Sequence, residues 1–210
     1  MPGITLNAFE KDILGEIGNM CVGNATTALA QILGKRIELS LPGVAVININ
    51  QLHTYLRVDP EESILGIHMQ VLGGVKGNAL MIFPRKDAFR LVDVLIGPLN
   101  QDLGNFTEIG ISAIKEVGNI VVSSYLSALS AFTGISAFPS TVTLSSGATR
   151  SLITLAFSGL RAADCEDTIL VEAVFKESKR NLDGNFFIIF DATSIHAILK
   201  KAKAMVKDKE

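Results

Sequence analysis

The sequence predicts an α/β fold of the α+β type. It is expected to be one domain, residues 1–210, whose two pseudo-two-fold-related halves share a mostly antiparallel sheet with long amphipathic helices packed on it. One polar phrase occurs twice, 100 positions apart, and the expected order of helices and strands recurs after the second copy. Neither half could bury the apolar face of three strands and two helices alone. Pairing internal repeats 5–98 and 104–206 would bury both faces in a common core, and 48% of the residues are apolar.

The repeated phrase reads Glu-Ile-Gly-Asn at residues 16–19 and Glu-Val-Gly-Asn at residues 116–119. In both copies an acid precedes a carboxamide by three residues, with a glycine between them. Between residues 16 and 34, the offset of 100 aligns seven identical pairs, three of them within the phrase: Glu16/Glu116, Gly18/Gly118, Asn19/Asn119, Val22/Val122, Ala28/Ala128, Leu29/Leu129 and Gly34/Gly134. The repeat therefore indicates the architecture and marks where chemistry should be sought.

The first half is expected to open with a helix whose N-cap is Asn7, with Glu10 three residues on. The helix should end at Gly34, either as one helix or as two helices hinged near Gly23. A strand region over residues 35–50 carries a kink or bulge at Pro42-Gly43. There follow an exposed loop over 58–63, a hairpin of strands 64–72 and 78–83 joined by glycine-rich residues 73–77, and a helix over 86–96 ended by Gly97-Pro98.

The second half repeats this order. A cap among residues 105–108 opens a helix to Gly134; strands are expected at 142–144, 151–157, 169–176 and 185–190, and a lysine-rich helix at 192–206. The Gly-Asn pair that opens a strand at residue 77 recurs at residue 184, an offset of 107. The extra residues are therefore placed in loops around Gly147 and residues 162–167. Residues 98–104 connect the halves and do not have the composition of a flexible linker.

Composition and spacing argue against several classes of protein. The net charge of -2 does not fit a nucleic-acid binder, and no apolar run reaches the ~18 residues of a membrane span. No secretory signal is visible, so we expect a cytoplasmic protein that binds neither nucleic acid nor membrane. Cys21 and Cys165 lack CxxC spacing, which favours buried free thiols over a disulfide. His53, His68 and His196 have no second ligand at i+3 or i+4, so no metal and no other bound cofactor is expected.

The repeated phrase lies on one side of each predicted helix, because residues three and four apart share a face. Asp12, Glu16, Asn19 and Gly23 form one polar stripe, and Ser112, Glu116, Asn119 and Ser123 form its counterpart. The apolar residues of the first helix lie mainly on the other side: Phe9, Ile13, Ile17, Val22, Ala25, Leu29 and Ile32. Both stripes should therefore point outward, toward solvent or a partner.

Glycines crowd these stripes: Gly15, Gly18 and Gly23 in the first copy, and Gly118 in the second. Each mid-helix glycine costs about 1 kcal/mol relative to alanine, so three in one helix cost roughly 3 kcal/mol. Close approach of another backbone, from the paired half or from a docking partner, would explain them.

The residues alone leave the chemistry open. A surface Glu is ordinarily a solvated charge, and symmetrical packing at the pseudo-two-fold axis would also explain the duplicated Asn. Asn cannot act as a general base. The pair could orient a water or a lysine.

The first copy resembles the signature of the CheC/CheX/FliY family of chemotaxis phosphatases. Asp12, Glu16 and Asn19 stand at the signature spacing, and Pro42 follows after twenty-two residues. The resemblance covers essentially the whole chain. It points to the stand-alone, two-site CheC type, since the additional flagellar-switch domain of FliY is not visible.

The second copy matches the serine version of the signature through Ser112, Glu116 and Asn119. Its proline, Pro139, follows after nineteen residues instead of twenty-two. A shorter turn after Gly134 would account for the difference.

The resemblance implies hydrolysis of the aspartyl phosphate of a phosphorylated CheY-type response regulator in chemotaxis signalling. Catalytic roles would fall to Glu16, Asn19, Glu116 and Asn119, and supporting roles to Asp12, Ser112, Gly18 and Gly118. Each Asn would orient the attacking water, and each Glu would pair with the regulator lysine that holds the phosphate. The regulator would bring its own Mg²⁺.

The family resemblance also suggests a receptor deamidase of the CheD type as a partner. One alternative is a non-catalytic binding module or adaptor for a response regulator or for such a deamidase. A structural piece of the flagellar switch is a further alternative.

Overall fold

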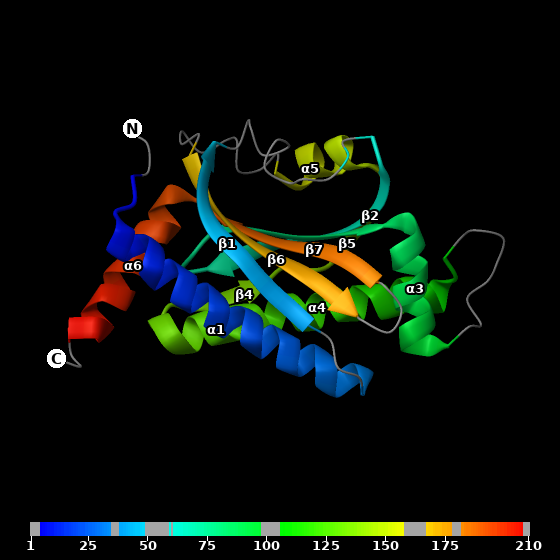
Figure 1. The fold of residues 1–210 in the computed structure, drawn as a ribbon, viewed down its shortest axis with the longest axis horizontal. Coiled ribbons are helices and arrows are strands. Elements are labelled where there is room, and N and C mark those ends of the chain that lie inside the picture. The colour runs from blue at the N-terminus through cyan, green and yellow to red at the C-terminus, as the bar shows by residue number, and fades with distance from the viewer. Residues whose placement is uncertain are drawn as a thin grey trace.

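The computed structural model describes residues 5–34, 38–48, 59, 61–97, 106–157, 167–177 and 182–207. In chain order the elements are α1 (Ala8–Leu33), β1 (Glu38–Asn48), β2 (Ser63–Gly73), β3 (Gly77–Pro84), α3 (Arg85–Ile96), α4 (Glu108–Thr133), β4 (Ala137–Pro139), β5 (Thr143–Ala148), α5 (Thr149–Phe157), β6 (Asp167–Glu177), β7 (Leu182–Phe190) and α6 (Ala192–Lys207). Their arrangement is shown in Figure 1.

One sheet holds the strands of both halves, in the order β1-β6-β7-β3-β2-β4, with β5 also pairing β2. Each of these pairings is antiparallel. Exchanging β1 with β5, β2 with β6 and β3 with β7 reverses the order and leaves it unchanged, with the β3–β7 pair at the centre. The predicted α+β class, with a shared antiparallel sheet, is confirmed. The repeat limits 5–98 and 104–206 stay a prediction.

The helices α1 and α4 lie side by side against one face of the sheet, and α5 lies on the opposite face (Figure 1). The larger core fills the space between α1, α4 and the sheet; Ile17, Leu29, Ile67, Val121 and Tyr125 are among its buried residues. A smaller cluster under α5 contains Ile64, Leu80, Leu152 and Phe187. The two long helices are thus fixed on the sheet by one apolar side, and the other side is free for function.

The first helix is one continuous helix of 26 residues, not two helices hinged near Gly23. Asn7 accepts from the Glu10 backbone N–H, and the Glu10 carboxylate accepts from the Asn7 N–H, each at 2.9 Å. This predicted capping box is confirmed, as is the end at Gly34, whose φ is 58°.

The second helix has the same length and ends at Gly134, with φ 68°. Its N-cap is Thr107, within the predicted range of residues 105–108. In the first half, the register of β1 against β6 shifts between Ser40 and Gly43, which confirms the predicted bulge at Pro42-Gly43. The predicted hairpin is β2 and β3.

The prediction of a strand over residues 151–157 is wrong. This segment belongs to α5, in which Leu152 and Ile153 are buried against the far face of the sheet. Its run of β-branched and apolar residues suggested a strand, but the edge position beside β2 is already taken by β5, which pairs with Ser63–His68. Tertiary context therefore overrides local propensity here.

Two smaller predictions are also corrected. The strand predicted at residues 142–144 extends to Ala148, so Gly147 lies in β5 opposite Ile64 and not in a loop. The three-residue strand β4 was not predicted. Residues 98–104 and 162–166 lie outside the described residues, and so does Cys165. Cys21 is free and buried, as predicted, and burial raises the pKa of its thiol to about 12.

No helix in the described part of the chain is long and apolar enough to cross a membrane.

Candidate functional site

The polar stripe of α1 points away from the sheet. Asp12, Glu16 and Asn19 are exposed, whereas Ile13 and Ile17, which lie between them in the sequence, are buried. The helical period places these two sets on opposite sides. The predicted outward orientation of the first Glu–Asn pair is therefore confirmed.

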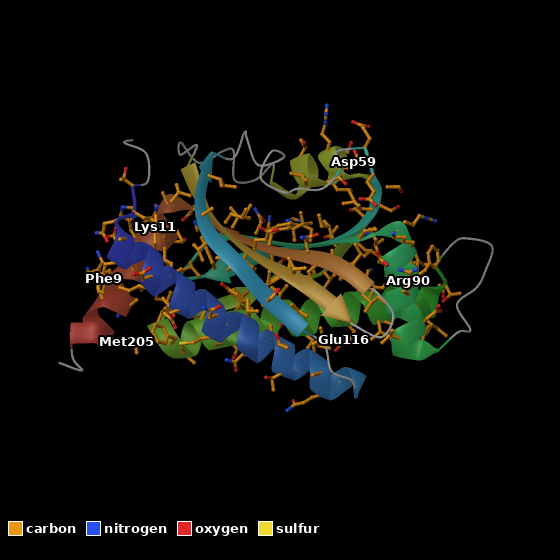
Figure 2. The ribbon with its side chains drawn as sticks, viewed as in Figure 1. Phe9, Lys11, Asp59, Arg90, Glu116 and Met205 are labelled. Atoms are coloured by element: carbon orange, nitrogen blue, oxygen red, sulfur yellow. The ribbon has the colours of Figure 1, made fainter. Side chains whose placement is uncertain are left out.

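The stripe of α4 has the same orientation. Ser112, Glu116 and Asn119 are exposed, and Ile114 and Val117 are buried beneath them. Figure 2 shows Glu116 on the lower side of the molecule. Both copies of the repeated pair therefore offer their carboxylate and carboxamide to solvent.

The glycine between the two residues of each pair is buried. A Cβ on Gly118 would lie 2.6 Å from Cγ2 of Ile67 on β2, much closer than a carbon–carbon contact allows. Gly18 is buried at the equivalent position. Gly118 therefore permits close packing of its helix on the sheet of its own chain, not close contact with an outside partner. Gly15 and Gly23 face open space.

The two carboxamides have different neighbours one turn further on. The Ser123 hydroxyl donates to Oδ1 of Asn119 at 3.3 Å. The equivalent position in α1 is Gly23, which has no side chain to give. In the second copy the bond occupies the amide oxygen of Asn119 and leaves its two N–H donors for another molecule.

The helices meet along their C-terminal halves, where a groove of about 530 Å³ runs between them. It is lined by Asn24, Thr27, Ala28, Gln31, Ser123, Ser124, Ser127, Ala128 and Ala131. Asn19 precedes Ala28 by nine residues, or about 13 Å along the helix, and Asn119 precedes Ala128 equally. The structure therefore holds two separate Glu–Asn pairs, one on each side of the groove, and does not combine them in one site.

The N-terminal end of each long helix is held by a different neighbour. Nζ of Lys203 on α6 lies 2.6 Å from Oε1 of Glu10, and this bond, with the Asn7 N–H bond, lowers the pKa of the Glu10 carboxyl. At α4, Phe106 stacks on Phe89 of α3 with ring centroids 4.1 Å apart. The first site is thus anchored by an ion pair and the second by aromatic packing.

Exposed apolar residues near both pairs were missed in the sequence. Phe9 was assigned to the buried stripe but is 52% exposed, and Ile109, at the same offset of 100, is 68% exposed. Met20, next to Asn19, is 46% exposed. The signal available was the repeat itself: both helices have a large apolar residue seven positions before the Glu.

Among the described residues, no three His, Cys, Asp or Glu side chains are grouped closely enough to hold a metal ion.

A family model described as the CheC-like family matches the chain in two segments, residues 9–45 and 109–136. These segments contain all but the first residue of α1 and of α4, and therefore all four residues of the two Glu–Asn pairs. The same model thus matches both copies of the repeat.

Two relatives from Bacillus subtilis are similar to the chain. The CheY-P phosphatase CheC is 25% identical over 192 residues, which cover 90% of this chain and 91% of CheC. The flagellar motor switch phosphatase FliY is 28% identical over 126 residues, which cover 60% of this chain and 32% of FliY.

Solved structures share the fold. FliY from Thermotoga maritima aligns with a TM-score of 0.75 and 22% identity, covering 96% of this chain and 99% of that one. The FliM middle domain from H. pylori aligns with a TM-score of 0.63 and 18% identity, covering 93% of this chain and 99% of that one, and a chain of a FliG–FliM complex from H. pylori aligns with a TM-score of 0.64 and 15% identity, covering 93% and 100%. At these identities the likeness establishes the architecture alone.

Proposed function

We propose that the chain, both of whose long helices match the CheC-like family model, is a phosphatase that hydrolyses the aspartyl phosphate of a phosphorylated CheY-type response regulator in chemotaxis signalling. One observation carries the proposal: the exposed Glu–Asn pair occurs twice, on the two helix segments that the family model matches. The full-length similarity to a CheY-P phosphatase supports the same reaction.

The residues of this chain need not form a covalent bond with the substrate. An aspartyl phosphate is an acyl phosphate with a good leaving group, so the step that needs help is placing a water in line with the P–O bond. Asn19 and Asn119 orient that water through their carboxamides. Hydrolysis by positioning and electrostatics needs no covalent intermediate on the phosphatase.

The carboxylates hold the partner in place. Glu16 and Glu116 each lie one helical turn before the Asn and pair with the lysine that holds the phosphate on the regulator. Asp12 and Ser112 support the same face one turn earlier, and Gly18 and Gly118 keep each helix close to the sheet. The Mg²⁺ that balances the phosphoryl charge is held by the regulator.

The deciding experiment is phosphate release from phosphorylated regulator by the wild type and the double variant Asn19→Ala/Asn119→Ala. Loss of the water-positioning carboxamides should lower kcat/KM about 100-fold. Asn24→Ala is the matched control, because Asn24 is an exposed Asn on α1 whose amide instead bonds the Met20 carbonyl. Unchanged hydrolysis by the double variant would sink the mechanism.

An adaptor without turnover is the second candidate. The fold is shared with FliM, one of whose structures is a complex with FliG, so the scaffold alone does not require catalysis. An adaptor would bind the regulator or a CheD-type deamidase equally well with and without both Asn residues, and would release no phosphate. We propose such a deamidase as a second, cytoplasmic partner, and co-purification of the two proteins tests it.

A further inference from the structure

We propose that exposed apolar side chains beside each Glu–Asn pair, Phe9 and Met20 on α1 and Ile109 on α4, are the contacts that seat the regulator and select it. This inference rests on the proposed function and deepens it, since it names the residues that determine which partner is bound.

The exposure of these side chains is unusual for their size. Phe9, Met20 and Ile109 are 52%, 46% and 68% exposed, although both helices bury an extensive apolar side against the sheet. A single exposed apolar residue needs no explanation. Here, however, the exposed residue occurs at the same place in both copies, seven residues before the Glu.

Helical geometry puts these residues on the functional face. At about 100° per residue, Phe9 projects within about 20° of Glu16 and lies about 10 Å from it along the axis. Met20 projects within about 40° of Glu16 and lies about 6 Å beyond it on the other side. The carboxylate is thus bracketed by two apolar side chains. Figure 2 shows Phe9 at the outer end of the molecule, where α1 begins.

The second copy has the same arrangement with smaller side chains. Ile109 precedes Glu116 by seven residues, and Ile120 follows it by four, as Met20 follows Glu16. Ile120 is only half-buried, whereas Met20 is exposed. Both copies therefore fit one kind of partner surface, with the larger apolar contact at the first.

The occupant that this face fits is the regulator itself. In the proposed function the Glu–Asn pair contacts a phosphoryl group and a lysine. Regulators of this class share both groups, so these contacts cannot distinguish one regulator from another. Apolar contacts about one to two turns away reach the variable surface around the phosphorylation site. Selection among partners requires such contacts outside the shared chemistry.

The test separates the sites by using single-site backgrounds. In Asn119→Ala, hydrolysis proceeds at the first site, and Phe9→Ser should raise KM about tenfold with kcat within about twofold. Ile109→Ser should do the same in the Asn19→Ala background. Phe9→Leu, which keeps an apolar contact, should restore most of the affinity. Thermal unfolding of each variant establishes that it is folded.

Ile32→Ser is the matched control. Ile32 is on the same helix and is 56% exposed, but it projects about 140° away from Phe9 and should leave KM unchanged. Unchanged KM for both serine variants would overturn the inference, while loss of hydrolysis in the double Asn variant would leave the proposed function standing.

Hydrolysis that did not depend on Asn19 and Asn119 would contradict the proposed function but not this inference. In that case a binding measurement tests whether the apolar side chains contact the regulator. The probe is the CheY-type regulator loaded with beryllofluoride, a phosphoryl mimic. A Phe9→Ser/Ile109→Ser double variant should bind it about tenfold more weakly. Binding as tight as that of the wild type would overturn the inference by itself.

Discussion

The helices α1 and α4 carry the same exposed Glu–Asn pair. Comparing them separates the residues that the site requires from those that support it. Both are 26 residues long, both end at a left-handed glycine, and both expose a Glu–Asn pair above a buried glycine. Around these shared positions the chain has diverged. Asp12 corresponds to Ser112 and Gly23 to Ser123, and the N-terminal anchors are an ion pair at α1 and an aromatic stack at α4.

The positions that both helices share, the Glu, the Asn and the glycine between them, differ in whether they are exposed or buried. The Glu and the Asn point outward and serve a partner, whereas the buried glycine points inward and serves the sheet. A surface that only needed to be soluble would not have to keep the Glu and the Asn, and a helix that docked loosely would not need the glycine. Substitutions can test each half of this division.

The largest expected effect is on stability, and it contrasts two glycines of the repeated helices. Gly118→Ala places a methyl 2.6 Å from Cγ2 of Ile67, a stiff β-branched side chain that is itself buried. Overpacking of this kind costs about 1–3 kcal/mol of unfolding free energy. Gly15→Ala meets nothing within 4 Å and should stabilise the helix by about 1 kcal/mol.

Urea denaturation of the two variants measures the difference. Gly23→Ala, another open position, serves as a control and should behave like Gly15→Ala. If Gly118→Ala were as stable as the wild type, the close approach of α4 to β2 would not be what holds a glycine in the repeat.

The second effect concerns the two carboxamides. Because Ser123 donates to Asn119, that side chain is already oriented, whereas Asn19 must be ordered when the partner binds. We expect Asn119→Ala to lower kcat about threefold more than Asn19→Ala, by the side-chain ordering cost of about 0.5–1.5 kcal/mol. Phosphate release at saturating regulator measures both. Equal losses would mean that the serine does not distinguish the sites.

Exchanging the residues at positions 23 and 123 should change kcat less, and it tests the serine directly. Ser123→Gly, measured in the Asn19→Ala background, should lower kcat about two- to threefold, since one hydrogen bond is worth roughly 0.5–1.5 kcal/mol. Gly23→Ser, in the Asn119→Ala background, should raise kcat at the first site. Ser127→Gly is the control, because Ser127 lies in the groove one turn beyond Ser123.

The repeat explains how much of this could be read from the sequence. Asn7, Gly34 and Gly134 are local signals, and they fixed the ends of both long helices because capping depends on only a few neighbouring residues. The outward Glu–Asn pairs followed from helical period alone. Symmetry of the sheet followed from matching the halves.

The errors occur where a residue's partner is distant in the sequence. Residues 151–157 have strand propensity, but whether they pair depends on which segment occupies the edge of β2, and β5 does so. The role of Gly118 depends on Ile67, 51 residues away (118 − 67), and it cannot be inferred from its own helix. Phe9 is an error of another kind, because helical period alone places it about 20° from the exposed Glu16, and its side chain is 52% exposed.

The smallest expected effect tests the ion pair of Glu10 that anchors α1, a position at which α4 has Gly110. The bond from Lys203, followed by the bond from the Asn7 N–H, lowers the folded pKa of Glu10 below its ordinary value of 4.5. A lowered carboxyl pKa adds stability that is fully present above the unfolded pKa and is lost as the pH falls through the folded pKa. Lys203→Ala should therefore lower Tm slightly at pH 7 and make Tm less dependent on pH below about 5.

The control is Lys200→Ala. Lys200 is an exposed lysine on the same helix, and its substitution should leave the dependence of Tm on pH unchanged. If Lys203→Ala left the profile as steep as in the wild type, the capping box alone would account for the lowered pKa, and the two helices would differ less at their N-terminal ends than the ion pair indicates.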